Sequence, residues 1–488
     1  MSDMNTKTIF DREDPEIVWV CAEDVKGKGS YDAPFGKLTD ALQVVKPGEA
    51  VVLKSGVYTH DQTIEISGSV ERPIQICSED DAGVIIQSAC WFFYDVCDLI
   101  VSDLTFKDSP HGSLSVIGNC RRNRFHNLQF YNCGTAEKTS CAVFFGGGGA
   151  RFNLFENCTF ENPKNETKTV TAENASIAMM ISDGDNESSQ LIKNHIFRRN
   201  TFRNYDYGII VGTRAASGFN SGHIVEYNTI ENCNEDGIVV KVGDTQVRAN
   251  LLANCRTNSI SVAAGIGTVI ENNRVIDGFR GILVKDFGQT ISNNCIIRCS
   301  KEAIRVSGKS DSENSPASNL FIQQNTFIDC GKSTDNHTEK SPLSPGLAIE
   351  QGSSCIIEKN LVCTSGAPYR IETAENSTAQ TNCVIMDNLC CGTQNIADGF
   401  RGSDVAFSNA EEDDYRNSSG YGANGPMLTP AAFDPQEQEN QEVDYVMASV
   451  LEDEEGNVII PDDSEDSNPF SSLPDELIDF RNQLDEDS

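Results

Sequence analysis

One sequence phrase recurs in the middle of the chain: an asparagine, a short apolar run and then a glycine-led strand. Its copies begin at Asn200, Asn228, Asn250, Asn273 and Asn294, so the steps are 28, 22, 23 and 21 residues. Within each copy β-branched residues alternate with polar ones, and one copy can bury its apolar side only against its neighbours. A repeat of this length predicts a stacked β-solenoid in which each copy is one coil.

A solenoid grows by adding coils, so most of the 488 residues can form one long domain. We expect a flexible N-terminus over 1–14, a solenoid over 15–400 and an acidic C-terminal extension over 401–488 that is largely irregular or disordered. The stretch PFGKLTDALQVV near the start predicts a short amphipathic helix that covers the open end of the stack. In the extension, the apolar patches VIIP and LIDF are candidate contacts for a protein partner.

The charge of the chain limits its partners. Acidic residues number 73 against 38 basic ones, which gives a formal net charge of −35. This balance argues against nucleic acid and anionic membranes as general partners. No segment is long and apolar enough for membrane insertion, and no signal peptide is visible in the first residues.

Eighteen cysteines raise the question of disulfides. Many of them follow an asparagine at the same repeat position, as in Cys133, Cys158, Cys233 and Cys255. A residue that recurs once per coil stacks on itself, and such a column is expected to pack as small buried thiols. Cysteine usage therefore favours a reducing, cytoplasmic location over secretion.

Basic residues in the repeat predict a binding surface. When the asparagines are aligned, Lys241, Ala264 and Lys285 occupy the same position in three successive coils. Arg214 and Arg305 lie near the same edge. Coils stack at roughly 4.8 Å, so the two lysines would stand about 10 Å apart. A basic stripe in so acidic a chain suits an anionic polymer, and His223 flanks this surface. The alternative is a scatter of ordinary solvated bases.

The segment 206–276, from DYGIIVGTRAASG to ENNRVI, resembles the central coils of polysaccharide lyase family 6, the chondroitinase B and alginate lyase family. The resemblance implies an all-β, single-stranded, right-handed parallel β-helix. It also implies a calcium ion that neutralises a uronate carboxylate, a lysine that removes the C5 proton and an arginine one coil on that assists the leaving oxygen.

Carried over residue by residue, the family pattern matches only in part. Glu235 occupies the position of the family's first acidic calcium ligand. The position of the second ligand holds Gly237, with Asp236 beside it, and Asn204 completes the implied set of calcium ligands. Lys241 matches the lysine base when one residue is deleted before it. Ala263 or Ala264 stands where the arginine belongs. Arg280 and Lys285, one coil further, substitute for it only if the substrate sits one step along.

Three functions follow as alternatives. The first is a polysaccharide lyase-like protein that cleaves an acidic, uronate-containing polysaccharide by β-elimination. The second is a β-helix that binds such a glycan without chemistry, and the third is a structural or assembly protein, such as a surface or virion component. The histidines show no metal spacing, and no clustered aspartate pair of the kind that pectin-hydrolysing β-helices use is evident.

Overall fold

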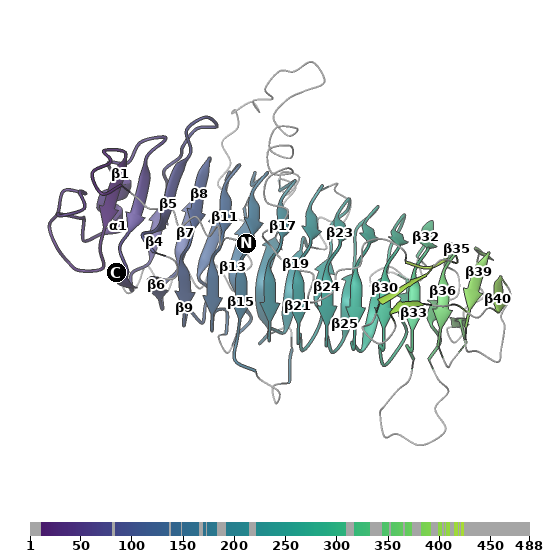
Figure 1. Cartoon of the computed structure of the whole chain (residues 1–488). Coiled ribbons are helices and arrows are strands. Elements are labelled where there is room, and N and C mark those ends of the chain that lie inside the picture. The colour runs from purple at the N-terminus through teal and green to yellow at the C-terminus, as the bar shows by residue number, and fades with distance from the viewer. Residues whose placement is uncertain are drawn as a thin grey trace, which may run out of the picture.

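The described part of the molecule is a long right-handed parallel β-helix (Figure 1). The computed structural model describes residues 11–423, except for 81–82, 136–137, 148, 165–168, 172, 183–191, 214–220, 309–316, 332–343, 351–352, 365–366, 373–381, 392–398, 403–404, 406, 410–413, 418 and 420. Each coil contributes one strand to sheet A, the next to sheet B and the next to sheet C, and all pairings within these three sheets are parallel. The predicted fold class is confirmed.

Sheet A contains fourteen strands. They are β1 (Ile17–Val20), β2 (Ala50–Leu53), β5 (Ile74–Ser78), β8 (Leu99–Ser102), β11 (Arg124–His126), β14 (Leu154–Glu156), β17 (Ile196–Arg198), β20 (Ile224–Glu226), β23 (Gln246–Arg248), β26 (Val269–Glu271), β29 (Thr290–Ser292), β32 (Leu320–Gln323), β35 (Ser354–Glu358) and β38 (Asn382–Met386).

Sheet B also has fourteen strands. They are β3 (Gly56–Tyr58), β6 (Val84–Gln87), β9 (Thr105–Lys107), β12 (Gln129–Tyr131), β15 (Thr159–Glu161), β18 (Thr201–Arg203), β21 (Thr229–Glu231), β24 (Leu251–Ala253), β27 (Arg274–Ile276), β30 (Cys295–Ile297), β33 (Thr326–Ile328), β36 (Leu361–Cys363), β39 (Asn388–Cys390) and β40 (Phe400–Gly402).

Sheet C has twelve strands and carries most of the candidate site. They are β4 (Gln62–Ile64), β7 (Trp91–Tyr94), β10 (Leu114–Ile117), β13 (Ser140–Gly146), β16 (Ser176–Ser182), β19 (Tyr207–Val211), β22 (Ile238–Val240), β25 (Asn258–Val262), β28 (Arg280–Val284), β31 (Ile304–Val306), β34 (Leu347–Glu350) and β37 (Tyr369–Glu372).

The repeated asparagines form a ladder inside the coil. The backbone N–H of each member except the last donates to Oδ1 of the asparagine in the next coil, at 2.9 to 3.0 Å, and the N–H of Asn388 donates to the Gly399 carbonyl. The members are Asn200, Asn228, Asn250, Asn273, Asn294, Asn325, Asn360 and Asn388, all nearly inaccessible to solvent. A buried amide satisfied in this way keeps the chain in register from coil to coil.

A second set of asparagines occupies the corner after sheet B, where the chain turns with positive φ. Asn204, Asn232 and Asn254 have φ values of 62°, 59° and 57°. Asparagine tolerates this left-handed conformation better than most residues. The ladder members themselves do not have positive φ, so asparagine serves hydrogen bonding in the ladder and backbone conformation at the corner.

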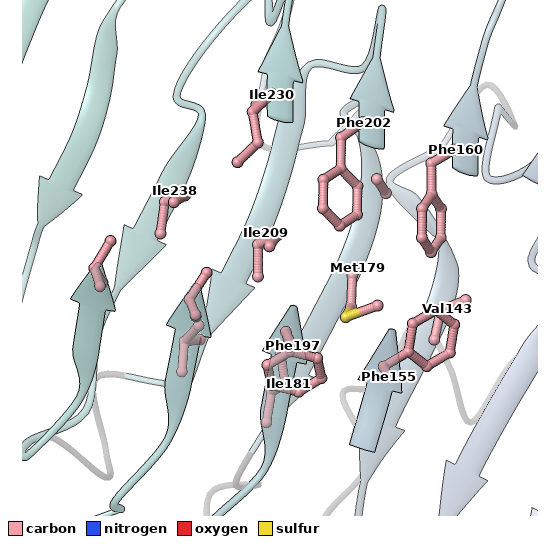
Figure 2. Packing of buried hydrophobic residues seen from close by; sticks show 14 of the residues in the cluster. Val143, Phe155, Phe160, Met179, Ile181, Phe197, Phe202, Ile209, Ile230 and Ile238 are labelled. Carbon is pink, nitrogen blue, oxygen red and sulfur yellow. The ribbon is translucent and has the colours of Figure 1, made fainter. Parts of the chain in front are cut away.

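The interior is filled by columns of apolar side chains (Figure 2). Phe106, Phe130, Phe160 and Phe202 stack in successive coils of sheet B, with ring centroids 4.5 to 5.1 Å apart. From Ile230 onward the same column is mostly aliphatic until Phe327. Each column therefore buries one side chain per coil against its neighbours.

The N-terminal end of the stack is closed by the one helix of the described residues. Helix α1 (Leu38–Leu42) packs against β1 and β4, and it buries Leu38, Ala41 and Leu42 in the core. Figure 1 shows it at the purple end of the stack. The predicted capping helix is confirmed. No helix in the described ranges has the length and apolar character needed to cross a bilayer.

Near the opposite end, short segments follow the last coil. The strands β41 (Phe407–Asn409) and β42 (Asp414–Asn417) form an antiparallel pair. The segment 421–423 returns to sheet B, where the N–H of Ala423 donates to Thr326 Oγ1 at 2.8 Å and the N–H of Gly422 to the Lys359 carbonyl. The apolar patches VIIP and LIDF lie outside the described residues.

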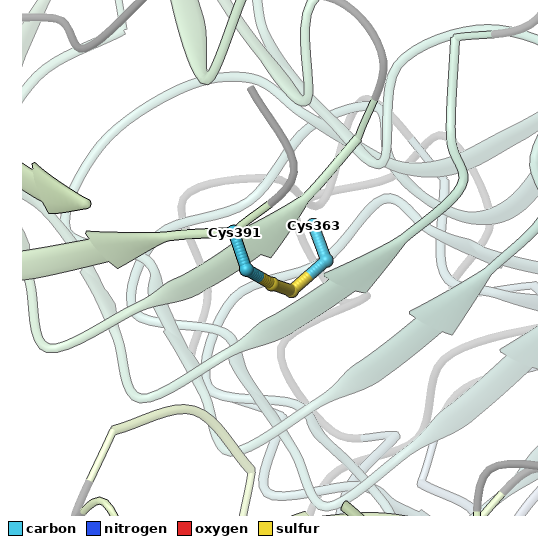
Figure 3. Close-up of a disulfide and its surroundings, with 2 residues drawn as sticks. All are labelled: Cys363 and Cys391. Atoms are coloured by element: carbon cyan, nitrogen blue, oxygen red, sulfur yellow. A yellow bond between two sulfur atoms is a disulfide. The ribbon is translucent and has the colours of Figure 1, made fainter. Parts of the chain in front are cut away.

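Most cysteines are buried thiols. Sixteen are free, and the recurring Cys133, Cys158, Cys233 and Cys255 are at most 1% exposed. This confirms the expected packing of the column. One pair is oxidised: Cys363 and Cys391 form a disulfide between adjacent coils of sheet B, with a Cα–Cα distance of 4.7 Å (Figure 3).

Candidate functional site

The two lysines of the predicted basic stripe lie in one column at the end of the sheet C strands. Lys241 directly follows β22, and Lys285 directly follows β28. The residue between them is Ala263, whose N–H donates to the Val240 carbonyl at 2.9 Å, while the N–H of Lys285 donates to the Val262 carbonyl at 3.1 Å. Two strand spacings separate the lysines, which is about 10 Å.

The register corrects one detail of the alignment. Ala263, not Ala264, stands between the two lysines, because Val240 pairs with Val262 and Val262 with Val284. Ala264 is the next residue along and is buried. We call Lys241, Ala263 and Lys285 the lysine column.

Arg305 belongs to the same sheet but to a neighbouring column. It pairs with Leu283 in the register, two positions before the lysine column, and its side chain is 28% exposed. Its Nη1 lies 3.6 Å from Glu302 Oε1. Arg305 therefore stands beside the lysine column and is held by a carboxylate.

A row of polar side chains crosses the opposite end of the sheet C strands. It consists of Asp236, Asn258, Arg280 and Glu302, one per coil at intervals of 22 residues, and we call it the polar row. Asn258 Nδ2 donates to Asp236 Oδ1 at 2.8 Å, Arg280 Nη1 donates to Asn258 Oδ1 at 2.9 Å, and Arg280 Nε donates to Glu302 Oε2 at 3.0 Å. The row is continuous over four coils.

Arg280 lies in the polar row, at the opposite end of the sheet C strands from Lys241. This position contradicts the expectation that the two residues act together as catalytic partners. Arg280 opens β28 and Lys285 follows its last residue, so the row and the lysine column lie about 16 Å apart along the strand. The guanidinium of Arg280 is also committed to Glu302 and Asn258. It is a structural cation of the row.

Burial changes the pKa values of side chains at the end of sheet C that holds the polar row. Asp236 is 9% exposed, and burial raises the pKa of its carboxyl to about 6 against the hydrogen bonds from Asn258. Burial, with the nearby Glu235 and Asp236 carboxylates, raises the pKa of Tyr207 to about 12. The end of sheet C that holds the polar row therefore disfavours additional negative charge.

The expected calcium ligands do not form a calcium site. Asp236 Oδ1 already accepts two N–H groups of Asn258, Glu235 Oε2 accepts the Thr257 hydroxyl at 2.8 Å, and Asn204 bonds along the corner ladder to Asn162 and Asn232. Calcium needs six or more oxygens around one point. Across the described ranges, no three Asp, Glu, His or Cys side chains converge as a metal site requires.

Gly237 occupies the position of the family's second calcium ligand. The packing around it explains why this position holds a glycine. A Cβ added there would lie 2.7 Å from the Ser259 carbonyl oxygen and 2.8 Å from Leu252 Cδ2. The position therefore faces the packed interior, where an acidic side chain has no room.

One predicted substrate contact is not available on this surface. His223 is fully buried, its ring stacks on His195 at 5.2 Å, and its Nδ1 accepts the His195 backbone N–H at 3.2 Å. Burial lowers the pKa of His223 to about 3. The prediction that His223 binds substrate is therefore wrong. Arg214 lies outside the described residues.

Sequence reasoning missed Asn258 and Glu302. A signal was present, because both fall on the 22-residue spacing that also links Asp236 to Arg280.

Comparison with known proteins agrees with the fold. Residues 183–341 match the family model of the right-handed β-helix region. A family 6 alginate lyase, AlyGC, superposes with a TM-score of 0.64 at 19% identity over 85% of this chain, and this chain spans 57% of the length of that lyase. A search of curated proteins found no matching sequence.

Two further solved structures are similar over nearly their whole length. A mannuronic acid specific family 6 lyase from human gut microbiota gives a TM-score of 0.59 at 18% identity, covering 81% of this chain and 93% of its own. A family 6 alginate lyase in complex with a trisaccharide gives a TM-score of 0.51 at 15% identity, covering 85% of this chain and 94% of its own. At these identities the likeness establishes a right-handed parallel β-helix like that of the family 6 lyases.

Proposed function

We propose that this protein is a polysaccharide lyase-like β-helix that holds an acidic, uronate-containing polysaccharide across the lysine column. The observation that carries the proposal is the alignment of Lys241 and Lys285 two coils apart on one face of sheet C. A spacing of about 10 Å suits alternate charges of a sugar chain, and a local positive field attracts a polyanion even when the whole chain is acidic. Arg305 supplies a third cation on the same sheet.

Lys241 is the residue that we assign to chemistry. It stands at the family's base position, and in β-elimination it would take the proton at C5 of a uronate held against Lys285. Removal of that proton creates negative charge next to the carboxylate, and this charge must be met by a cation. Lys285 is the nearest cation of the column, and no step is assigned to calcium.

Binding without cleavage is the second candidate, and Ala263 favours it. The position one coil from Lys241, where the family has an arginine, carries a methyl side chain, and Arg280 is bound within the polar row. A protein with this arrangement retains cations for binding and lacks the family's group for the leaving oxygen.

One experiment separates these functions. The purified protein is incubated with alginate, chondroitin, dermatan and pectate, with and without calcium, and the absorbance of the unsaturated product is followed. Affinity electrophoresis in gels that contain the same polymers measures binding in parallel. The variants are Lys241→Ala, Lys285→Ala and, as a matched control, Lys107→Ala, which removes an exposed lysine at the end of β9 in sheet B.

The outcomes are distinct. Product that disappears in Lys241→Ala and persists in Lys107→Ala supports the lyase. Retardation without product, weakened by loss of either column lysine, supports the binding protein. Neither product nor retardation refutes both and favours a structural or assembly role.

A further inference from the structure

Two adjacent coils near the C-terminal end of the stack carry the same pair of cysteines. Residues 354–363 read SCIIEKNLVC and residues 382–391 read NCVIMDNLCC, so Cys355 and Cys363 recur as Cys383 and Cys391 after 28 residues. Asn360 and Asn388 of the inner ladder occupy the same place in both segments. The repeat thus aligns two cysteines of one coil with two cysteines of the next.

The strand register brings both pairs face to face. Cys355 pairs directly with Cys383 across β35 and β38 in sheet A, and their sulfur atoms lie 2.6 Å apart. Val362 pairs with Cys390 across β36 and β39, which places Cys363 opposite Cys391, the pair already joined. Neighbouring strands lie about 4.8 Å apart, within the Cα separation that a disulfide requires.

Their position at the end of the stack distinguishes Cys355 and Cys383 from the thiols of the interior. Strand β38 is the last strand of sheet A, and Cys383 on it is partly exposed. Cys233 and Cys255, by contrast, are 1% exposed in the middle of the helix. An oxidant can therefore reach the pair in the terminal coils, whereas the inner thiols are shielded by packing.

We propose that Cys355 and Cys383 form a second disulfide, so that two cross-links, one in sheet A and one after sheet B, fasten the last coil to the one before it. Both bonds join the same two coils at different points of the coil. Together they fix its register and its orientation. This inference is independent of the proposed polysaccharide site.

The bond requires a disulfide-containing oxidant, such as oxidised glutathione. The Cys383 thiolate attacks one sulfur of that oxidant, forms a mixed disulfide and releases the first thiolate. Cys355 then gives up its proton, attacks Cys383 Sγ and releases the second thiolate. Two protein thiols are oxidised while one external disulfide is reduced to two thiols. The hydrogen bond from Cys355 lowers the pKa of Cys383, which suits Cys383 to the first attack.

The proposed bond would protect an exposed edge. Among the described strands, β38 is the final strand of sheet A and pairs only with β35, and an unpaired edge can recruit another chain. Its outward side chains include Val384 and Met386, which are 50% and 45% exposed. A covalent link to β35 would hold this terminal strand in place.

Peptide mapping tests the proposal on the full-length protein. One sample is equilibrated with oxidised glutathione and another with dithiothreitol. Both are denatured in an excess of N-ethylmaleimide, digested without reduction and analysed by mass spectrometry. We expect a linked peptide pair that contains Cys355 and Cys383, in a yield similar to that of the Cys363–Cys391 pair, and we expect both pairs to be lost after dithiothreitol.

The proposal is overturned if Cys355 and Cys383 both carry the maleimide in the oxidised sample while Cys363 and Cys391 are linked. Linkage of Cys355 or Cys383 to any other cysteine overturns it as well. This reading requires no variant, so it does not depend on whether a substituted protein folds.

Hydrogen exchange supplies a second readout. In oxidised protein, Cys383→Ser is expected to speed exchange of the amides of β38 about tenfold, because a constraint on local opening is removed. The control is Cys97→Ser, which removes a partly exposed free thiol that bonds to the Asn119 carbonyl in an earlier coil. Equal exchange of β38 in the two variants would contradict the proposed cross-link.

Discussion

The two ends of the sheet C strands both carry cations, but they use them differently. At the start of the strands, Arg280 is 18% exposed and bonds to Glu302 and Asn258 within the polar row. At the end of the strands, Lys241 and Lys285 are partly exposed and flank an alanine. The guanidinium of Arg280 is bound within the polar row, whereas the lysines of the column lie partly exposed.

This difference shows why residue type alone does not identify a binding site in a β-helix. A cation that recurs at the coil spacing can be a structural partner for the next coil or a contact for a ligand. Burial and hydrogen-bond partners decide between them. Arg280 opens β28 and is bound within the polar row, whereas Lys285, just after the same strand, is proposed as a ligand contact.

The largest expected effect comes from breaking the polar row. Arg280→Ala removes the main partner of Glu302, which is 5% exposed, and leaves a buried carboxylate with only the longer contact to Arg305. We expect a loss of about 3 kcal/mol in the free energy of unfolding. Urea denaturation followed by circular dichroism measures it.

The matched variant is Lys285→Ala on the same strand, which we expect to change stability by less than about 0.5 kcal/mol. Equal losses for the two variants would mean that the two ends of the strands do not differ as described.

The next effect concerns the pH dependence of the polar row. Burial raises the pKa of Asp236 to about 6 from 3.8, so the folded state holds the proton more tightly than the unfolded state. The stabilisation is complete below the unfolded pKa and is lost as the pH rises through about 6. We expect wild type to lose on the order of 2 kcal/mol between pH 4 and 7 relative to Asp236→Asn.

The asparagine variant retains an oxygen that can accept the hydrogen bonds of Asn258. If wild type and Asp236→Asn show parallel stability profiles over this range, the carboxyl is not perturbed in the fold.

A smaller effect is expected at the lysine column. Lys241→Ala and Lys285→Ala should each weaken binding of the recognised polyuronate about tenfold, which corresponds to about 1.4 kcal/mol. Raising the salt concentration should reduce the difference from wild type, because exposed charges are screened. Affinity electrophoresis at two ionic strengths measures both, and an unchanged affinity for either variant would argue against the column.

The smallest effect is a gain. Ala263→Arg places a third cation between the two lysines, and we expect binding to strengthen a few-fold, since attraction to the polymer is partly offset by repulsion between neighbouring cations. Weaker binding in this variant would show that the polymer does not pass over residue 263. A gain of product formation would indicate that the family's arginine position is functional in this fold.

The coil repeat was sufficient to predict the solenoid, the buried thiol column and the alignment of Lys241 with Lys285, and the apolar spacing within 34–45 predicted the capping helix. These features depend on a spacing that is visible in the sequence. The placement of Ala263 depended on a one-residue shift that only the strand register resolves. The burial of His223 was not predictable from one histidine, because it stacks on His195 from the preceding coil.

The predicted roles of Arg280 and Asp236 failed for a related reason. The family pattern assigns the two residues to catalytic and calcium-binding positions, while their hydrogen-bond partners lie one coil away at Asn258 and Glu302. A side chain that completes its hydrogen bonds within the protein is not available for a ligand. This property depends on neighbours in the stack rather than on neighbours in the sequence.

Lysine footprinting gives the most direct test of the binding surface. The protein is acetylated at limiting reagent with and without the polyuronate that it retards, and modification is read at each lysine by mass spectrometry. We expect the polymer to protect Lys241 and Lys285 while Lys107 on sheet B and Lys359 at a sheet A corner keep their reactivity. Unchanged reactivity of both column lysines in the presence of bound polymer would contradict the account.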